Sequence, residues 1–161
     1  MQLKKNTQLT LRIDSFGAGG EGVARYEGMP IFIPFALPGE TVQALIVKTE
    51  KRYAFGKLLQ VITPSDQRVA PVCPYYGKCG SCSCQHMKYE AQLEFKRNQV
   101  QNCLKYIAGL EVEVQPVLGM NDPWHYRNKT SLPVSEKDGE IQIGYYAQRS
   151  HRVIDIESCA L

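Results

Sequence analysis

The cysteine pattern constrains this chain more than any other feature. Cys73, Cys79 and Cys82 form a C-x5-C-x2-C cluster, and Cys159 stands alone close to the end of the sequence. Four thiolates from two distant segments can close around one metal centre, which requires a fold that brings these segments together. Two glycines within the loop permit tight turns and let amide N–H groups point at sulfur. The pattern therefore favours an iron–sulfur cluster.

Zinc and disulfides remain as alternative uses of these cysteines. Structural zinc sites usually take two short cysteine pairs, and the sequence holds one. Disulfides belong to oxidising compartments, whereas the sequence starts without an apolar signal region and has no apolar run of membrane-span length. We therefore expect a cytoplasmic protein that does not bind a membrane. Cys103 falls on an apolar helical stripe and is predicted to be a core residue, while Cys84 stays ambiguous.

The charge distribution indicates a polyanionic partner. Among 161 residues, 43% are hydrophobic, which suits one ordinary domain or two small ones. Residues 1–110 carry 14 Lys or Arg and 8 Asp or Glu, whereas residues 111–161 carry 5 and 8. A basic region of this kind is compatible with RNA binding and equally with a solvated surface of scattered lysines.

Residues 1–65 are predicted to form a small closed barrel of the OB type with about five strands. Residues 9–13 alternate apolar and polar side chains, as a half-buried strand does. Further strands are predicted at residues 31–33, 41–47 and 55–61, separated by glycine-containing turns. The glycine-rich residues 17–22 lack the Gly-Lys-Ser/Thr ending of a phosphate-binding loop, so we interpret them as a bend.

One turn of this barrel combines positive charge with an aromatic ring. Lys48, Lys51, Arg52 and Tyr53 lie between two predicted strands. Cations can contact phosphates and a ring can stack on a base, so these residues are predicted to bind RNA. An exposed basic loop without a partner is the alternative.

Residues 66–161 are predicted to form a small α+β unit around the cysteines, which makes the chain mainly β. A helix is expected from about residue 88 to 108, and strands at 126–134, 141–146 and 153–156. Asp138-Gly139 predicts a hairpin, and the last strand would deliver Cys159. Arg127, Asn128 and Lys129 are predicted to face RNA, with a solvated strand edge as the alternative.

Motifs along essentially the whole chain resemble one known family. The segments Glu21–Arg25, Pro30–Pro34 and Leu37–Glu40 are similar to the TRAM domain. The cysteine loop through His86, together with Trp124–Lys129 and Val153–Cys159, is similar to an iron–sulfur signature. Both belong to the bacterial RNA 5-methyluridine (uracil-5-) methyltransferases, which act on ribosomal or transfer RNA.

The resemblance implies a TRAM barrel followed by a central domain with a 4Fe-4S cluster on Cys73, Cys79, Cys82 and Cys159. It implies an RNA partner, a role in RNA processing and a monomer. Two positions depart from the family, which usually has Gly at Ser81 and an apolar residue at Cys84.

The family's catalytic half is missing from this sequence. That half has an S-adenosylmethionine site, a nucleophilic cysteine and a glutamate base, so the resemblance implies that the cofactor belongs to the missing domain. We therefore expect a fragment that binds RNA and a cluster but does not transfer methyl groups. A free-standing iron–sulfur RNA-binding module is the alternative.

Overall fold

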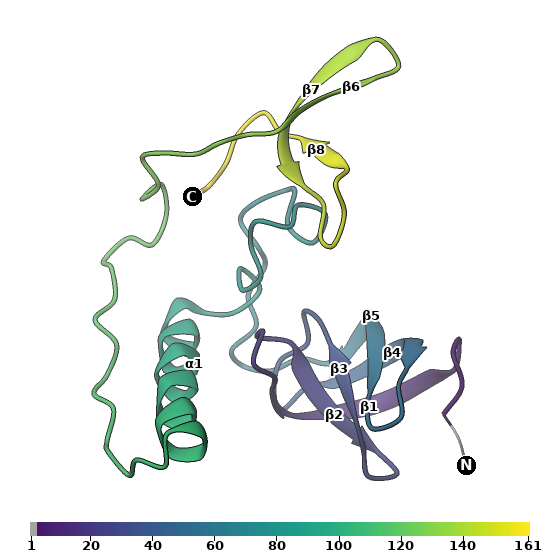
Figure 1. The fold of residues 1–161 in the computed structure, drawn as a ribbon, viewed down its shortest axis with the longest axis vertical. Helices are drawn as coiled ribbons and strands as arrows, with labels where there is room; N and C mark the ends of the chain where they lie inside the picture. Colours follow the sequence, from purple (N-terminus) through teal and green to yellow (C-terminus); the bar gives the residue numbers. More distant parts are fainter. Residues whose placement is uncertain (1–2) are drawn as a thin grey trace. The chain divides into compact units, whose positions relative to one another are not determined.

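A computed structural model describes residues 3–161 and divides the chain into two compact units. The first ends at Arg68 and is called the barrel unit here, and the second, Val69–Leu161, is called the cysteine unit. Figure 1 labels the helix and the strands of both units. Each unit has its own architecture and is described by itself.

The barrel unit is a closed five-stranded barrel, as predicted. Its strands are β1 (Gln8–Phe16), β2 (Gly22–Tyr26), β3 (Met29–Ile33), β4 (Thr41–Thr49) and β5 (Ala54–Thr63). Around the barrel they follow the order β1-β2-β3-β5-β4. All neighbouring pairs are antiparallel except β3 and β5, which pair in parallel. A mainly β fold with an OB-like barrel is therefore confirmed.

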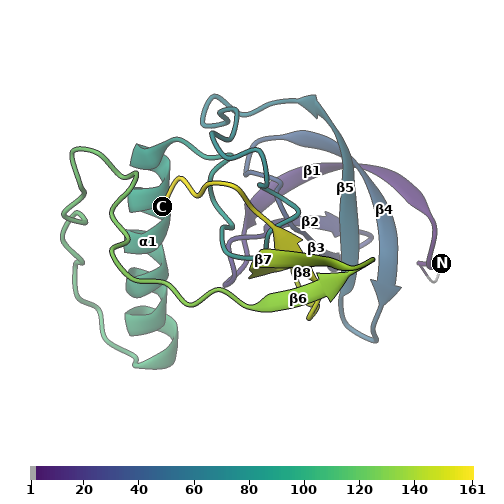
Figure 2. The ribbon, with the colours of Figure 1, turned by 90° about the horizontal axis from the view of Figure 1, so that it is seen from above.

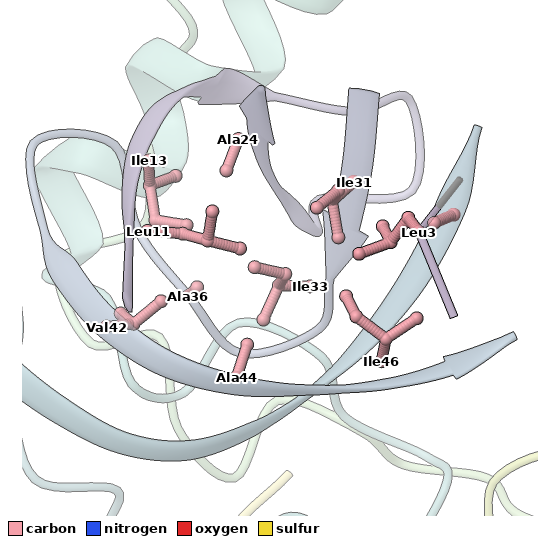
Figure 3. Packing of buried hydrophobic residues seen from close by; sticks show 11 residues of the cluster. Leu3, Leu11, Ile13, Ala24, Ile31, Ile33, Ala36, Val42, Ala44 and Ile46 are labelled. Carbon is pink, nitrogen blue, oxygen red and sulfur yellow. The ribbon is translucent and has the colours of Figure 1, made fainter. Parts of the chain in front are cut away.

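The inside of the barrel is filled by small and branched apolar side chains (Figure 3). The alternation predicted for residues 9–13 is observed, since Leu11 and Ile13 are buried while Arg12 is exposed. The other buried members of the core are Leu3, Ala24, Ile31, Ile33, Ala36, Val42, Ala44, Ile46 and Ala54. Burying each large member contributes about 1.5–3 kcal/mol, so this unit has a core of its own.

Strand β2 was not assigned from the sequence, because a glycine opens it and an arginine interrupts its short apolar pattern. At Gly22, an added Cβ would lie 2.7 Å from the carbonyl oxygen of Ala36 and 2.9 Å from Ile13 Cγ2. Glycine is therefore required there for the close approach of β1, β2 and the segment after β3.

The cysteine unit contains one helix and a three-stranded antiparallel sheet. Helix α1 spans Tyr89–Asn102 and continues as the π-helical turn η1, Cys103–Ile107. The strands are β6 (Val134–Lys137), β7 (Glu140–Tyr146) and β8 (Val153–Asp155), in the order β6-β7-β8 (Figure 2). No helix among residues 3–161 is long and apolar enough to cross a membrane.

The hairpin between β6 and β7 forms as predicted. Asp138 and Gly139 both have positive φ, at 56° and 84°, which a two-residue turn of type I′ requires. The predicted strand at 126–134 is wrong, because β6 begins only at Val134. Pro133, which lacks an N–H for a sheet ladder, immediately precedes that start.

The prediction that Cys103 is a core residue is also wrong. Cys103 is exposed, and no residue of α1 or η1 is buried. Tyr106 and Ile107, on the predicted apolar stripe or beside it, are 75% and 83% exposed. Helical spacing correctly predicted the helix, but spacing does not say whether another element covers the apolar side.

A buried ion pair closes the barrel unit at its end. Glu40 is 0% exposed, and its carboxylate accepts hydrogen bonds from the backbone N–H groups of Leu37 (2.8 Å) and Ser65 (3.2 Å). Arg68 donates to both carboxylate oxygens, through Nε at 2.5 Å and Nη2 at 2.8 Å. The same Nη2 donates to the carbonyl of Phe35 at 2.7 Å. The pair therefore ties the segment after β5 to the turn before β4.

Two opposing effects set the pKa of the Glu40 carboxyl. Burial raises this pKa, but the hydrogen bonds from Arg68 and from the Leu37 and Ser65 N–H groups outweigh burial and hold it below the usual 4.5. A lowered pKa contributes stability that is present above the usual value and is lost as pH falls through the lowered one.

We expect Glu40→Gln to destabilise the barrel unit by about 2–4 kcal/mol at neutral pH, because Arg68 loses its charged partner in a buried setting. The unchanged protein should lose stability below pH 4.5, where the Glu40 carboxylate becomes protonated. This loss should be smaller in the Gln variant, which has no carboxylate at this position. Hydrogen exchange of the barrel amides measures both effects in this unit.

Glu50→Gln is the matched control, since Glu50 pairs with Lys48 at 2.7 Å on the surface. It should change stability by no more than about 1 kcal/mol. Equal effects of the two substitutions would contradict the role assigned to the buried pair.

Candidate functional site: a cavity lined by four cysteines

Four cysteines from the two ends of the cysteine unit line one cavity. They are Cys73, Cys79, Cys82 and Cys159, the four singled out from the sequence. Cys84 lines a neighbouring groove instead, and Cys103 is exposed on η1. The cavity wall is completed by Tyr75, Tyr76, Ser81, Gln85, Tyr145, Ile156 and Ser158.

The neighbouring groups of the cavity affect the thiol of Cys82. Burial raises the pKa of the Cys82 thiol above its usual 9.0, and the charges of Cys79, Cys159 and Cys73 raise it further. A hydrogen bond with Gln85 acts in the opposite direction and lowers it. A cation or cationic centre between the four sulfurs would remove their mutual repulsion.

Side chains inside the loop fix the positions of its cysteines. Gln85 Oε1 accepts a hydrogen bond from the Cys73 N–H at 3.2 Å. The Tyr76 hydroxyl lies 2.7 Å from the Ser83 carbonyl oxygen and 2.6 Å from Nδ1 of His86, which is buried. Because a carbonyl only accepts, Tyr76 donates to Ser83 and accepts from the Nδ1–H group of His86.

Backbone contacts bring the distant Cys159 to this loop. The Gly80 N–H donates to the Tyr146 carbonyl at 2.9 Å, and Cys79 forms an isolated β-bridge with Ala147. The Glu157 N–H donates to the Tyr75 hydroxyl at 3.2 Å, two residues before Cys159. The end of β7 and the segment after β8 are therefore both attached to the loop.

The four thiols are not arranged around a single metal ion. No group of three or more His, Cys, Asp or Glu side chains among residues 3–161 is arranged to hold one metal ion. Tetrahedral zinc with Zn–S distances of about 2.3 Å would hold its thiolates only about 3.8 Å apart. An iron–sulfur cluster is bulkier and takes four cysteines spaced farther apart. Four cysteine thiols lining one cavity are the type and number of ligands that such a cluster takes.

The predicted RNA-binding residues of the barrel lie in and beside the turn between β4 and β5. Lys51, Arg52 and Tyr53 are exposed, and Lys48 forms the surface pair with Glu50. The pKa of Lys48 is raised by the hydrogen bond from its ammonium to Glu50.

Tyr53 has two aromatic neighbours that were not predicted from the sequence. The Tyr53 ring contacts Phe32 and Phe55 edge to face, with centroids 6.0 and 5.5 Å apart. Phe32 and Phe55 are paired across β3 and β5 and are both partly exposed. Each is flanked by buried residues, so the strand period could have placed them on the outer face.

The second predicted RNA-binding set lies beside the cysteine cavity. Arg127, Asn128 and Lys129 line a shallow pocket together with Tyr145 and Cys159. Arg127 Nη1 lies 3.4 Å from the Tyr145 hydroxyl and is also within 3.5 Å of Ser81 Oγ. Hydrogen bonds to the Tyr145 and Tyr126 hydroxyls raise the pKa of Arg127, which stays charged. The two predicted sets thus belong to different units of the chain.

We expect Gly80→Ala to detach the cysteine loop from the end of β7. A Cβ there would lie 2.9 Å from the Tyr146 carbonyl oxygen and 3.1 Å from the Gln148 nitrogen, both backbone atoms that cannot rotate away. Limited proteolysis and amide exchange should show faster cleavage and exchange across residues 79–82. Ser81→Ala, the control at the next position, should leave the rates of cleavage and amide exchange unchanged. Equal protection of the two variants would contradict the role assigned to the contact between Gly80 and the end of β7.

Comparisons with known proteins agree with this architecture. Residues 2–59 match the TRAM domain. A protein of Clostridium tetani described as an uncharacterized RNA methyltransferase is 48% identical over 157 residues, which cover 98% of this chain and 34% of that protein. A protein of Listeria monocytogenes serotype 4b with the same description is 47% identical, over 99% of this chain and 35% of its own length.

A solved structure extends the similarity to both units. The tRNA (uracil-54, C5)-methyltransferase of Pyrococcus abyssi, in complex with S-adenosyl-L-homocysteine, is 30% identical with a TM-score of 0.62. The match covers 94% of this chain and 32% of that one. The chain spans about a third of the length of the curated relatives it matches. It thus contains a TRAM domain, and along nearly its whole length it is similar to the N-terminal third of proteins described as RNA methyltransferases.

Proposed function

We propose that the chain is the RNA-binding and 4Fe-4S-binding part of an S-adenosylmethionine-dependent RNA (uracil-5-)-methyltransferase that acts on ribosomal or transfer RNA in the cytoplasm. One observation carries the cluster part of the proposal, namely that four cysteines from two distant segments line a single cavity. The similarity to a tRNA (uracil-54, C5)-methyltransferase along 94% of the chain supports the substrate class.

In this proposal the two units have different tasks. The barrel unit binds RNA, and the cysteine unit holds the cluster and presents Arg127, Asn128 and Lys129 to the same RNA. Neither unit contains a Rossmann-like parallel sheet among residues 3–161, so S-adenosylmethionine would bind outside them. The chain by itself would recognise RNA without methylating it.

The cluster would be held by Cys73, Cys79, Cys82 and Cys159. It supplies four metal–thiolate bonds that join the loop to the segment after β8. A cross-link between segments so far apart in sequence removes loop-closure entropy from the unfolded chain and therefore stabilises the folded unit. A cross-link of this kind would stabilise a unit that has one helix, three short strands and few buried residues.

The basic side chains would contact RNA mainly through phosphates. Lys51 and Arg52 are exposed at the β4–β5 turn, and the aromatic ring of Tyr53 lies next to them. Phosphate contacts set affinity and its dependence on salt, while a ring adds stacking on bases.

The first test is metal content after anaerobic purification. We expect about four iron and four sulfide per chain with the brown colour of a 4Fe-4S protein. Cys159→Ser should lose the cluster and expose residues 71–161 to protease, while the barrel unit stays folded on its own core. Cys103→Ser is the control, and because Cys103 is exposed it should keep the iron and change stability by less than about 0.5 kcal/mol.

Three results would contradict this assignment. Stoichiometric zinc in a colourless protein would replace the cluster by a zinc site, and absence of both metals would leave the four thiols without a cofactor. A full cluster in the Cys159→Ser protein would make the ligand set wrong, with Cys84 as the next cysteine to test.

The second test concerns RNA. Replacing Lys51 and Arg52 with Ala should weaken binding to RNA and reduce the slope of log affinity against log salt by roughly 1.4–1.8, the value for two lost phosphate contacts. Fluorescence anisotropy of a labelled RNA at several salt concentrations measures both. The control is the double substitution Arg12→Ala and Lys57→Ala, which removes the same charge from exposed positions on β1 and β5. Identical slopes for the two double variants would exclude the turn as the RNA contact.

A further inference from the structure

The cysteine unit has a second, larger concave site beside the cysteine cavity, and Cys82 lies in the walls of both. This second site is a groove of about 680 Å³, called the Trp124 groove here. Apolar and aromatic side chains make up most of its wall, among them Met87, Tyr89, Phe95, Met120, Trp124 and Tyr126. Ligand sites of proteins are commonly apolar concavities of about 300–1,000 Å³, so the size suits a nucleotide or a small molecule.

Aromatic rings are partly exposed in this groove. Trp124 is the only tryptophan of the chain and is half-buried, and Tyr126 is 50% exposed. Partly exposed rings of this kind are the surfaces on which unpaired bases stack in single-stranded RNA complexes.

The charges of the groove are suited to a polyanion. Lys88, Lys96 and Arg127 line it, and Glu90 is the one acidic side chain among the described lining residues. The cations of the groove exceed its acidic side chains by two. Positive side chains around an apolar floor match a base with its flanking phosphates better than they match an apolar peptide.

Hydrogen bonds hold several walls of the groove in place. The Met120 N–H donates to the Tyr89 hydroxyl at 2.9 Å, which ties the segment after the helix back to its first turn. Gln92 Nε2 donates to the Met87 carbonyl at 2.9 Å on the opposite side of that turn. The Trp124 N–H donates to Asp122 Oδ1 at 3.0 Å and fixes the backbone that carries the ring. A site held in this way binds without a large cost of ordering.

We propose that the Trp124 groove binds an unpaired nucleotide of RNA, with the base stacked on Trp124 and the phosphates near Lys88, Lys96 and Arg127. The inference rests on the proposed RNA binding and adds a base-binding site in the cysteine unit to the phosphate-contacting turn of the barrel. Because a paired base cannot present its face to a ring, the groove selects unpaired RNA.

The single tryptophan makes the groove directly observable. The anaerobically purified full chain is titrated with oligouridine of about ten nucleotides, a length within the site size of single-strand binding modules. Tryptophan emission should change in a saturable way, with the same midpoint as the anisotropy of the labelled oligomer. A blunt duplex of the same length should produce no saturable change in emission.

Substitutions separate stacking from charge. Trp124→Leu should weaken binding to oligouridine about 10-fold, as expected for one lost base–aromatic stack, without altering the salt slope. Trp124→Leu should not change the affinity for an abasic oligomer of equal length. Trp124→Phe, which keeps an aromatic ring, should retain most of the affinity for oligouridine. Tyr106→Leu is the matched control, since Tyr106 is 75% exposed in the same unit and does not line the groove.

The outcomes distinguish this proposal from the one on which it rests. If oligouridine binds but neither changes the tryptophan emission nor responds to Trp124→Leu, the groove has another occupant, such as a polypeptide segment, and RNA binding by the barrel stands. If Trp124→Leu weakens binding of the abasic oligomer as much as binding of oligouridine, base stacking on Trp124 is excluded. If no RNA binds at all, the proposed RNA binding fails and this inference fails with it.

Discussion

The cysteine unit depends on the attachment of its C-terminal segment to the loop of residues 73–82. That attachment is built from the Gly80–Tyr146 backbone hydrogen bond, the hydrogen bond from the Glu157 N–H to the Tyr75 hydroxyl, and one close approach at Gly80, where no side chain fits beneath the Tyr146 carbonyl. It places Cys159 with the three loop cysteines around one cavity. The four thiols repel one another when they ionise, so the same geometry that collects them favours a positively charged centre between them.

The barrel unit is stabilised differently and independently. Its core is formed by apolar side chains from all five strands, and the one deeply buried charge among residues 3–68, Glu40, is neutralised by Arg68 and by two backbone N–H groups. A buried carboxylate without these partners would cost several kcal/mol. Each unit therefore has its own source of stability, which is packing in the barrel and the linked cysteine loop in the second unit.

Sequence patterns predicted an element correctly where its period was regular and its ends were marked. The alternation of Leu9, Leu11 and Ile13 identified β1, and Asp138-Gly139 identified the hairpin between β6 and β7. The patterns gave a wrong prediction where no neighbouring strand or packed surface covers the segment. Residues 126–133 look like a strand but pair with no neighbour in a sheet, and the apolar stripe that includes Cys103 is left uncovered.

The sequence by itself determined which residues could act together chemically. The C-x5-C-x2-C spacing and the lone Cys159 identified the candidate ligands, because the number of cysteines and their spacing can be read directly from the sequence. Only the tertiary structure decided that Cys159 reaches the loop, that Phe32 and Phe55 flank Tyr53, and that Trp124 lies in a groove with three cations. These are contacts between residues far apart in sequence, and local periodicity carries no information about which distant surfaces meet.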